Sequence, residues 1–261
     1  MSEILLTIDD SPSPDTDELT SFLQSQGIPA ILFCRGDRLR DNPDPVVRAI
    51  ERGFVAANHA FHHQRASTLT VDEVKAEILE TEKLLDQAYQ RAGRARPALY
   101  FRFPHMDRGT GGWVVDYSAV SAHEKTLRTL FADGLNVKLD PPTAEQIDKK
   151  SRLQEFLQAA GFTALPAAGI THDWYRQTEI ISAVDAMFTF STSDWMLTKR
   201  HLGKWPYQSI DDLKQKIDND PWLAVSGSTN IVLAHDQPEV LPVVKALVGH
   251  MLQKGFSFKP A

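Results

Sequence analysis

Two histidines in this sequence have a spacing that suits metal binding. His59 and His63 stand four positions apart in the segment H-A-F-H-H. On a helical turn this spacing places both imidazoles on one face, where they can bind one ion. Asp9 and Asp10 add carboxylates near the N-terminus. Two neutral imidazoles and a carboxylate leave coordination positions open, which is typical of a catalytic metal site. His62, between the two candidate ligands, is expected to be structural.

Each of these signals is weak when it is taken alone. Histidines more often occupy surface or core positions than metal sites, and D-D-S-P is an ordinary turn sequence. The position along the chain is more informative, because polar clusters come directly after the predicted strands or, for Arg102, near the end of one. The clusters are Asp9-Asp10, residues 59–63, Arg102, His172-Asp173-Trp174 and His235-Asp236. In a barrel of parallel strands the carboxyl ends form the active face, so these clusters should meet there.

Short apolar segments and amphipathic segments alternate along the chain. The apolar segments predict strands at residues 4–8, 30–33, 54–57, 99–103, 164–170 and 230–234. The amphipathic segments predict helices around residues 19–23, 46–51, 70–90, 143–160, 179–187 and 238–254, and a further helix after Ser209. Thr70 and Glu73 form a capping box at the start of the longest helix. This alternation predicts an α/β fold with parallel strands joined by right-handed crossovers.

The regular pattern is interrupted at residues 106–142, where we expect an insertion with one helix at 122–132. Because the insertion follows the fourth predicted strand, close to Arg102, we expect it to cover the active face and to narrow access for the substrate. The chain has no internal repeat and no linker rich in Gly, Ser or Pro. Residues 1–261 are therefore expected to form a single domain.

The composition argues against several classes of partner. The net charge is −6 and the basic residues form no stripe, so neither nucleic acid nor an anionic membrane surface is expected as a partner. The apolar run at residues 4–6 is too short for a secretion signal, and no segment approaches the roughly 20 apolar residues of a membrane span. A cytoplasmic protein is expected. The single cysteine, Cys34, lies in an apolar run and is expected to be buried.

Five motifs, in this order, resemble those of the NodB-homology polysaccharide deacetylases, carbohydrate esterase family four. They are T-I-D-D-S-P, H-A-F-H-H, R-F-P-H, H-D-W and L-A-H-D, and they span nearly the whole chain apart from the insertion. The resemblance implies a distorted, incomplete (β/α) barrel with a long insertion after the fourth strand. It also implies that Asp9 is the catalytic base, that Asp10, His59 and His63 hold the metal, and that Arg102 opens the third motif.

The resemblance implies further site residues in the later motifs. The backbone N–H after Pro104 is the oxyanion donor that the family suggests. Asp173 and Trp174 fit the fourth motif, and Leu233 and His235 fit the last one. We expect Leu233 and Trp174 to form the wall of a small acyl pocket. The substrate of the family is an amino-sugar-containing carbohydrate, which implies a carbohydrate or other small-molecule partner, and a homo-oligomer is compatible with the sequence.

Several positions depart from the family pattern, although none of them removes a ligand or the base. The departures are Ile8, Ser11, Ala60, Gln64, Phe103, His105 and Met106. Ala60 lacks the hydroxyl that is usual beside the first histidine, and so loses a hydrogen bond to the metal surroundings. His105 lies beside the third motif and is expected to contact the substrate. With these changes, both an amino-sugar-containing carbohydrate and a small amide or cyclic imide are compatible substrates.

The expected roles follow from metal-assisted hydrolysis. A divalent ion, Zn²⁺ in the first place, with Co, Ni, Mn or Fe compatible with the same ligands, lowers the pKa of water from about 15.7 towards ~7 and polarises the amide. Asp9 takes the proton of the water, and Arg102 keeps Asp9 ionised. His235 protonates the departing nitrogen, and we expect Asp173 to raise the pKa of His235.

Three functions are compatible with these residues. The first is a metal-dependent de-N-acetylase of an amino-sugar-containing substrate. The second keeps the site but acts on a small amide, formamide or cyclic imide in the cytosol, as in the allantoinase-like branch of the same superfamily. The third is a catalytically inactive sugar-binding module, which the presence of a base, three ligands and His235 disfavours because a binder needs no base.

Overall fold

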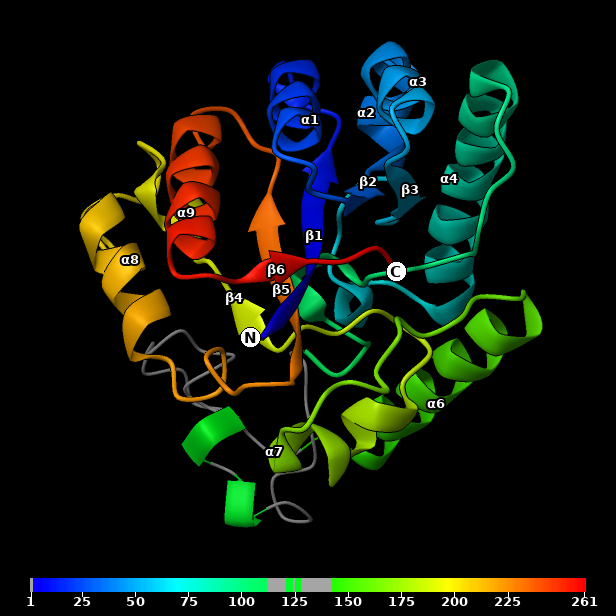
Figure 1. Cartoon of the computed structure of the whole chain (residues 1–261). Coiled ribbons are helices and arrows are strands. Elements are labelled where there is room, and N and C mark those ends of the chain that lie inside the picture. The colour runs from blue at the N-terminus through cyan, green and yellow to red at the C-terminus, as the bar shows by residue number, and fades with distance from the viewer. Residues whose placement is uncertain (1, 112–120, 124, 128–141) are drawn as a thin grey trace.

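A parallel β-sheet forms the centre of the molecule (Figure 1). The computed structural model describes residues 2–111, 121–123, 125–127 and 142–261. Its strands are β1 (Glu3–Ser11), β2 (Ala30–Cys34), β3 (Val55–Asn58), β4 (Phe190–Ser191), β5 (Thr229–His235) and β6 (Ser257–Phe258). Across the sheet the order is β3-β2-β1-β5-β4, and β6 pairs with the beginning of β1. All of these pairings are parallel, so the carboxyl ends of the strands lie at one end of the sheet.

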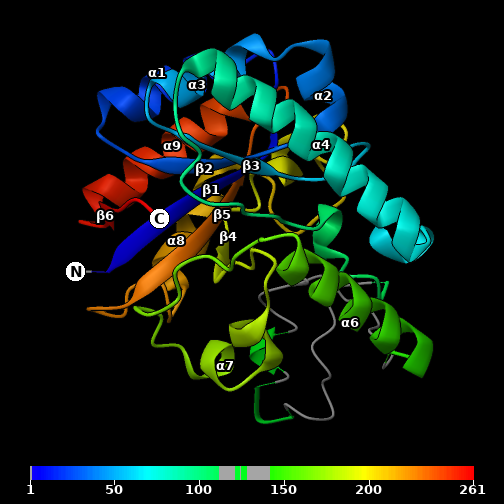
Figure 2. The same ribbon diagram turned by 90° about the vertical axis from the view of Figure 1, so that its right-hand side faces the viewer.

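Helices cover both faces of the sheet. The α-helices are α1 (Thr16–Ser25), α2 (Gly36–Asp41), α3 (Asp44–Glu51), α4 (Val71–Ala92), α6 (Ala144–Ala159), α7 (Asp173–Arg176), α8 (Ile210–Asn219) and α9 (Leu241–Gln253). Short 3₁₀ turns lie at Ala66–Thr68, Pro104–Met106, Ser121–His123, Glu179–Ser182 and Asp194–Leu197. In Figure 2, α1, α2, α3, α4 and α9 lie over one face, and α6 and α7 lie over the other. The expected α/β class with a parallel sheet is confirmed.

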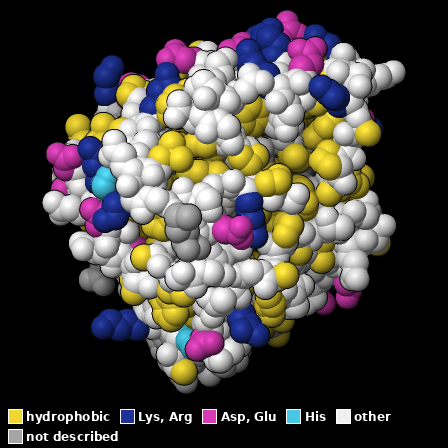
Figure 3. Space-filling model, in the orientation of Figure 1, with side chains coloured by type: hydrophobic (Ala, Val, Ile, Leu, Met, Phe, Trp, Pro, Cys, Tyr) yellow, Lys and Arg dark blue, Asp and Glu magenta, His cyan; other side chains and the backbone are white. Residues whose placement is uncertain are grey.

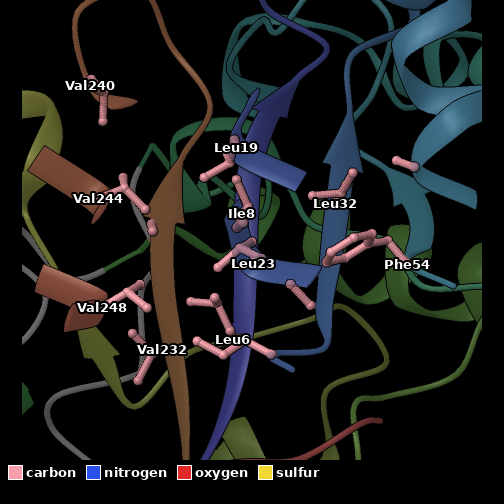
Figure 4. Close-up of a cluster of buried hydrophobic side chains, with 14 of the residues drawn as sticks. Leu6, Ile8, Leu19, Leu23, Leu32, Phe54, Val232, Val240, Val244 and Val248 are labelled. Atoms are coloured by element: carbon pink, nitrogen blue, oxygen red, sulfur yellow. The ribbon is translucent and has the colours of Figure 1, made fainter. Parts of the chain in front are cut away.

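The pleat of β1 divides its side chains between two apolar clusters, because successive residues of a strand point to opposite faces. Ile4, Leu6 and Ile8 belong to the buried cluster of the outer face, which is the face that α1, α3, α4 and α9 cover. Figure 4 shows Leu6 and Ile8 in this cluster. Leu5 belongs to a second buried cluster on the inner face. Asp9, four residues after Leu5, shares its face. The pattern of β1 thus directs Asp9 into the interior that an incomplete barrel encloses.

Most of the regular elements lie where the sequence predicts them. The predicted strands at 4–8, 30–33, 54–57 and 230–234 correspond to β1, β2, β3 and β5. The capping box of α4 is confirmed, since the Thr70 side chain accepts a hydrogen bond from the Glu73 N–H and the Glu73 side chain accepts one from the Thr70 N–H. Capping boxes also begin α6, at Thr143, and α8, at Ser209.

The predictions are wrong or incomplete where apolar segments cross the interior. Residues 99–103 make only an isolated bridge to β3, between Asn58 and Phe101. Residues 164–170 contain Pro166 and Gly169 and form no strand, and 179–187 is helical only in a 3₁₀ turn at its start. These apolar runs are buried as irregular backbone, most of them in the inner cluster and Phe101 and Phe103 in a third one. Periodicity alone cannot distinguish such a run from a strand or a helix. The short elements α2, β4 and β6 were not predicted.

The predicted helix at 122–132 falls mostly outside the described residues. The described part of the insertion near it contacts the surroundings of α7. Nε2 of His123 lies 2.8 Å from Oε1 of Gln177, and Leu127 is buried in the cluster that contains Leu5 and Trp174. These residues lie near the end of the sheet where the strands begin. For them, the expected position over the active face is wrong.

The surface seen in Figure 3 carries charges of both signs close together, with hydrophobic side chains between them. Lys and Arg side chains are interspersed with Asp and Glu on this face, as expected for a chain without a basic stripe. Among the described helices, none combines the length and apolar character that crossing a membrane requires.

Candidate active site and metal centre

The ends of β1, β3 and β5 bring the candidate residues of three motifs together. Asp9 is paired with His235 across β1 and β5, and Asn58, the residue before His59, is paired with Cys34 at the end of β2. A bulge interrupts the pairing of β1 with β2 between Asp9 and Ser11. A bulge re-aims side chains locally, and it allows two consecutive aspartates, which would face opposite sides of a regular strand, to serve one site.

Asp10, His59 and His63 form a cluster in which three ligand atoms lie within 4.8 Å of one another. Oδ1 of Asp10 lies 3.2 Å from Nε2 of His63 and 4.0 Å from Nε2 of His59. Nδ1 of His59 lies 2.8 Å from the carbonyl oxygen of Arg102. Since a carbonyl only accepts, Nδ1 carries the proton, and Nε2 keeps its lone pair for a metal.

The buried carboxylate of Asp10 fits a divalent ion. Its Oδ2 accepts a hydrogen bond from Gln237, and no donor among the described residues reaches its Oδ1. Burial alone raises the pKa of Asp10, but the positive charge that His63 and His59 carry when protonated opposes it and holds the pKa below its usual range. Burial lowers the pKa of His63 to about 2, against the charge of Asp10. The cluster therefore offers a carboxylate and a neutral imidazole, the forms that bind metals.

Unusual backbone conformations concentrate at this cluster. Asp10, His63 and His105 have φ angles of 69°, 58° and 54°. Residues with a Cβ adopt positive φ uncommonly, and such strain is maintained mainly at functional sites. This observation marks the cluster as a site independently of its ligand chemistry.

A buried ion pair lies next to the cluster. Nη1 of Arg102 is 2.7 Å from Oδ1 of Asp9, and it also donates to the Thr7 hydroxyl at 2.9 Å. The guanidinium carbon lies 4.3 Å from the centre of the Phe33 ring, a cation–π distance. Oδ2 of Asp9 lies 3.6 Å from Nε2 of His59. Arg102 thus contacts one oxygen of Asp9 and leaves the other facing the candidate metal ligands.

His235 is paired with Asp194 and not with Asp173. Nδ1 of His235 donates to Oδ1 of Asp194 at 2.6 Å, and the His235 backbone N–H donates to Oδ2 at 2.8 Å. Burial disfavours the charged imidazole, but the charge and hydrogen bond of Asp194 outweigh it and raise the pKa of His235 to about 9. The expected raised pKa is thus present, with a different carboxylate as its cause.

Asp173 and Trp174 lie at the opposite end of the sheet. Nε2 of the preceding His172 is 2.8 Å from Oδ1 of Asn230, which pairs with Ile4 near the beginning of β1. Asp173 itself is exposed, and Trp174 is buried in the inner apolar cluster. The expected roles of Asp173 beside His235 and of Trp174 in the acyl pocket are therefore wrong. Without a strand at 164–170, nothing carries these residues to the active face.

The remaining predicted residues lie in two places. Pro104 and His105 are in the 3₁₀ turn after Arg102. His105 is exposed, and its ring centre lies 4.4 Å from that of His63. Leu233 is buried in the inner apolar cluster. His105 therefore lies beside His63, one of the candidate metal ligands. A role of Leu233 in an acyl pocket stays a prediction.

Sequence reasoning missed Asp194, Gln237 and Glu77. A signal for Asp194 exists, because the dipeptide D-W occurs twice, at 173–174 and at 194–195. Glu77 of α4 accepts hydrogen bonds from the backbone N–H groups of Phe61 and His62, at 3.0 and 2.6 Å, and its Oε1 lies 2.6 Å from Nδ1 of His62. His62 is therefore structural, as expected. No local pattern points to Glu77 or to Gln237.

Comparison with known proteins gives a family match for the N-terminal part of the chain. Residues 2–110 match the polysaccharide deacetylase family. A chitooligosaccharide deacetylase of Rhizobium leguminosarum bv. trifolii is 33% identical over 86 residues, which are 33% of this chain and 40% of the relative. A peptidoglycan-N-acetylglucosamine deacetylase of Bacillus cereus is 29% identical over 87 residues, 33% of this chain and 32% of the relative. The matched part thus spans less than half the length of these relatives.

Solved structures match over the whole chain at low identity. The family 4 carbohydrate esterase from Streptomyces lividans, in complex with acetate, has a TM-score of 0.57 at 19% identity and covers 98% of this chain and 91% of its own. A family 4 pseudoenzyme from Bacillus anthracis has a TM-score of 0.57 at 14% identity, with 98% and 62% covered. The resemblance to the polysaccharide deacetylases is thus confirmed: residues 2–110 match that family, and the chain as a whole has the fold of carbohydrate esterase family four.

Proposed function

We propose that the protein is a metal-dependent amide hydrolase that removes N-acetyl groups from an amino-sugar-containing substrate. One observation carries this proposal: a carboxylate and an imidazole, each held by its own buried partner, flank the Asp10, His59 and His63 cluster. Asp9 is paired with Arg102, and His235 is paired with Asp194. A hydrolase needs one group to accept a proton and another to donate one, whereas a sugar-binding module needs neither.

Asp10, His59 and His63 would hold the metal. When bound, a divalent ion such as Zn²⁺ supplies an acidified water and polarises the substrate carbonyl. Two imidazoles and one carboxylate suit Zn²⁺, and Co²⁺, Ni²⁺, Mn²⁺ and Fe²⁺ are compatible with the same donors.

Asp9 serves as the base. Arg102 is fully buried and donates a hydrogen bond to one oxygen of Asp9 at 2.7 Å, which orients the carboxylate. The second oxygen lies 3.6 Å from Nε2 of His59, beside the cluster where a water would be activated. Asp9 accepts the proton of that water while the water attacks the amide carbon.

His235 serves as the acid. Its Nδ1 is committed to Asp194, so Nε2 is the nitrogen that faces a substrate. With a pKa of about 9, the imidazole is charged at neutral pH and protonates the departing nitrogen as the C–N bond breaks. The backbone N–H after Pro104 is the proposed donor to the developing oxyanion. His105, beside His63, is placed to contact the substrate.

The amino-sugar part of the proposal is supported by the names of the relatives, which are deacetylases of chitooligosaccharide and of peptidoglycan N-acetylglucosamine. A pseudoenzyme has the same fold, so the fold does not imply activity. Hydrolysis of a small amide or cyclic imide by the same site is the second proposal, because the third motif departs from the family at His105 and Met106. A cytoplasmic location and a homo-oligomer stay predictions from the sequence.

A substrate screen tests the proposal. The zinc-loaded protein is incubated with N-acetylglucosamine oligomers, with peptidoglycan fragments, and with cyclic imides and formamides, and the released acid is measured. Asp9→Ala is the blank. Acetate release from the sugars that Asp9→Ala abolishes is the expected result. Turnover of imides alone would establish the second proposal, and no release from any substrate would contradict both.

The rate should depend on pH through His235. Because its pKa is raised to about 9, kcat/KM should fall as the pH rises through about 9, where the imidazolium loses its proton. Asp194→Asn removes the charge that raises this pKa, so the alkaline limb should move to lower pH by about 1–3 units. The measurement is kcat/KM from pH 5 to 10. Asp173→Asn is the matched control, and a limb that moves in this control but not in Asp194→Asn would reverse the assignment.

A further inference from the structure

Gln237, two positions after His235, forms a hydrogen bond with one oxygen of the candidate metal ligand Asp10. Nε2 of Gln237 donates a hydrogen bond to Oδ2 of Asp10 at 2.5 Å. The other oxygen, Oδ1, is the one that lies 3.2 Å from Nε2 of His63. The amide of Gln237 therefore occupies Oδ2 and leaves Oδ1 for coordination.

Asp236, which lies between His235 and Gln237, forms hydrogen bonds with residues on both sides of Asp10. Its Oδ2 accepts hydrogen bonds from the hydroxyls of Ser11 and Thr16, at 2.9 and 2.5 Å, and its Oδ1 accepts one from Ser13 at 2.5 Å. The backbone N–H of Asp236 donates to the carbonyl oxygen of Asp9 at 2.8 Å. Asp236 is buried and both of its oxygens are engaged, so it supports the turn and does not face the substrate.

Asp10 needs such support because of its own backbone. It lies at the bulge of β1, with a φ of 69° that residues with a Cβ rarely adopt. Strained conformations persist only where the surroundings over-determine them. Arg38 adds a further contact, since its Nη1 donates to the carbonyl oxygen of Asp10 at 2.5 Å. The backbone and the side chain of Asp10 are thus held by different residues.

We propose that Asp236 and Gln237 are positioning residues for the metal ligand Asp10. Gln237 fixes the carboxylate so that it binds through Oδ1, and Asp236 fixes the strained turn that presents it. This inference rests on the metal site of the proposed function, although it does not depend on the substrate. It assigns to the segment His235-Asp236-Gln237 three tasks, namely proton donation, support of the turn and orientation of the ligand.

The first test is Gln237→Leu, which removes the donor and keeps a similar volume. Zn²⁺ affinity should fall by about 10–100-fold, the usual effect of losing a hydrogen bond to a metal ligand. The affinity is measured by titrating metal-free protein with Zn²⁺ against a competing chelator. Gln154→Leu is the matched control, because Nε2 of Gln154 donates to Oδ1 of the buried Asp185 at 2.7 Å, away from the cluster. It should leave Zn²⁺ affinity unchanged.

The unfolding temperature of the metal-free protein separates positioning from a general structural role. The unfolding temperature of metal-free Gln237→Leu should be equal to or higher than that of metal-free Gln154→Leu. Asp236→Asn should lower both Zn²⁺ affinity and the unfolding temperature. If that variant does not fold, Ser13→Ala, which removes one of the three hydroxyls on Asp236, is the replacement and should reduce Zn²⁺ affinity by a few-fold.

The outcomes are distinct from those of the substrate screen. A fall in Zn²⁺ affinity in Gln237→Leu, with the control unchanged, supports the inference whether or not any amide is hydrolysed. Affinity equal to that of the wild type overturns it. A wild-type protein that binds no Zn²⁺ overturns both the inference and the metal site on which the proposed function depends.

Discussion

Asp9→Asn should reduce kcat by about 10²–10⁴-fold, the contribution typical of a general base, while the protein still binds one metal ion. An asparagine amide cannot accept the proton of the attacking water, whereas the ligands Asp10, His59 and His63 are unchanged. Asparagine also keeps an oxygen that can accept the hydrogen bond that Arg102 donates to Asp9. The measurements are kcat on the substrate found in the screen and metal content by elemental analysis.

Thr7→Val is the control for the surroundings of Arg102. It removes the hydroxyl that accepts a hydrogen bond from Nη1 of Arg102 at 2.9 Å, but it leaves the pair of Arg102 with Asp9. Its kcat should fall far less than that of Asp9→Asn. Full activity in Asp9→Asn would remove Asp9 as the base. Loss of the metal in the same variant would make Asp9 a ligand instead.

His59→Ala and His63→Ala should each lose most of the bound metal and nearly all activity, with the fold kept. Each change removes one of three ligand atoms that lie within 4.8 Å of one another. Losing a residue that only supports a ligand costs about 10–100-fold in metal affinity, so the loss of a ligand should exceed 100-fold. Zn²⁺ titration of the metal-free variants gives the affinities, and circular dichroism checks the fold.

His62→Ala is the matched control in the same loop. The ring of His62 is directed to Glu77, with its Nδ1 2.6 Å from Oε1 of Glu77, and takes no part in the cluster. It should keep its metal and most of its activity. If His62→Ala lost metal as severely as the variants of its two neighbours, the division of this loop into ligands and a structural residue would be wrong.

The sequence by itself predicted the residues of the candidate metal cluster. It also predicted four strands of the sheet and most of the helices that cover its outer face. Regular alternation of apolar strands with amphipathic helices placed β1, β2, β3 and β5 in a parallel sheet, where strand ends necessarily lie together. The motifs containing Asp10, His59 and His63 lie at the ends of the predicted strands, so the local pattern predicted that they meet, and the resemblance to the deacetylase family named them as ligands. The capping box of α4 is likewise a purely local signal.

Prediction from the sequence was poor at residues 99–103, 164–170 and 179–187, although the helix predicted at 143–160 is present as α6. Apolar residues of these segments are buried, some in the inner cluster and others, such as Phe101 and Phe103, in a third cluster, but the backbone is irregular, with an isolated bridge at Phe101 and a 3₁₀ turn at Glu179–Ser182. Buried irregular backbone and buried strands have the same composition, because both remove apolar side chains from water. Only the packing of the interior determines which of the two forms.

The acid side of the site was decided by tertiary structure. The dipeptide D-W occurs at 173–174 and at 194–195, and local sequence does not discriminate between the two. Asp194 reaches His235 because it follows β4, a strand of two residues that pairs with β5 and is too short to be predicted. The hydrogen bond from Gln237 to Asp10 likewise joins residues 227 positions apart. The candidate ligands could be predicted because they lie at the ends of strands that local pattern identifies. Asp194, which sets the pKa of His235, and Gln237, which orients Asp10, could not be predicted, because their contacts form only when distant segments of the chain pack together.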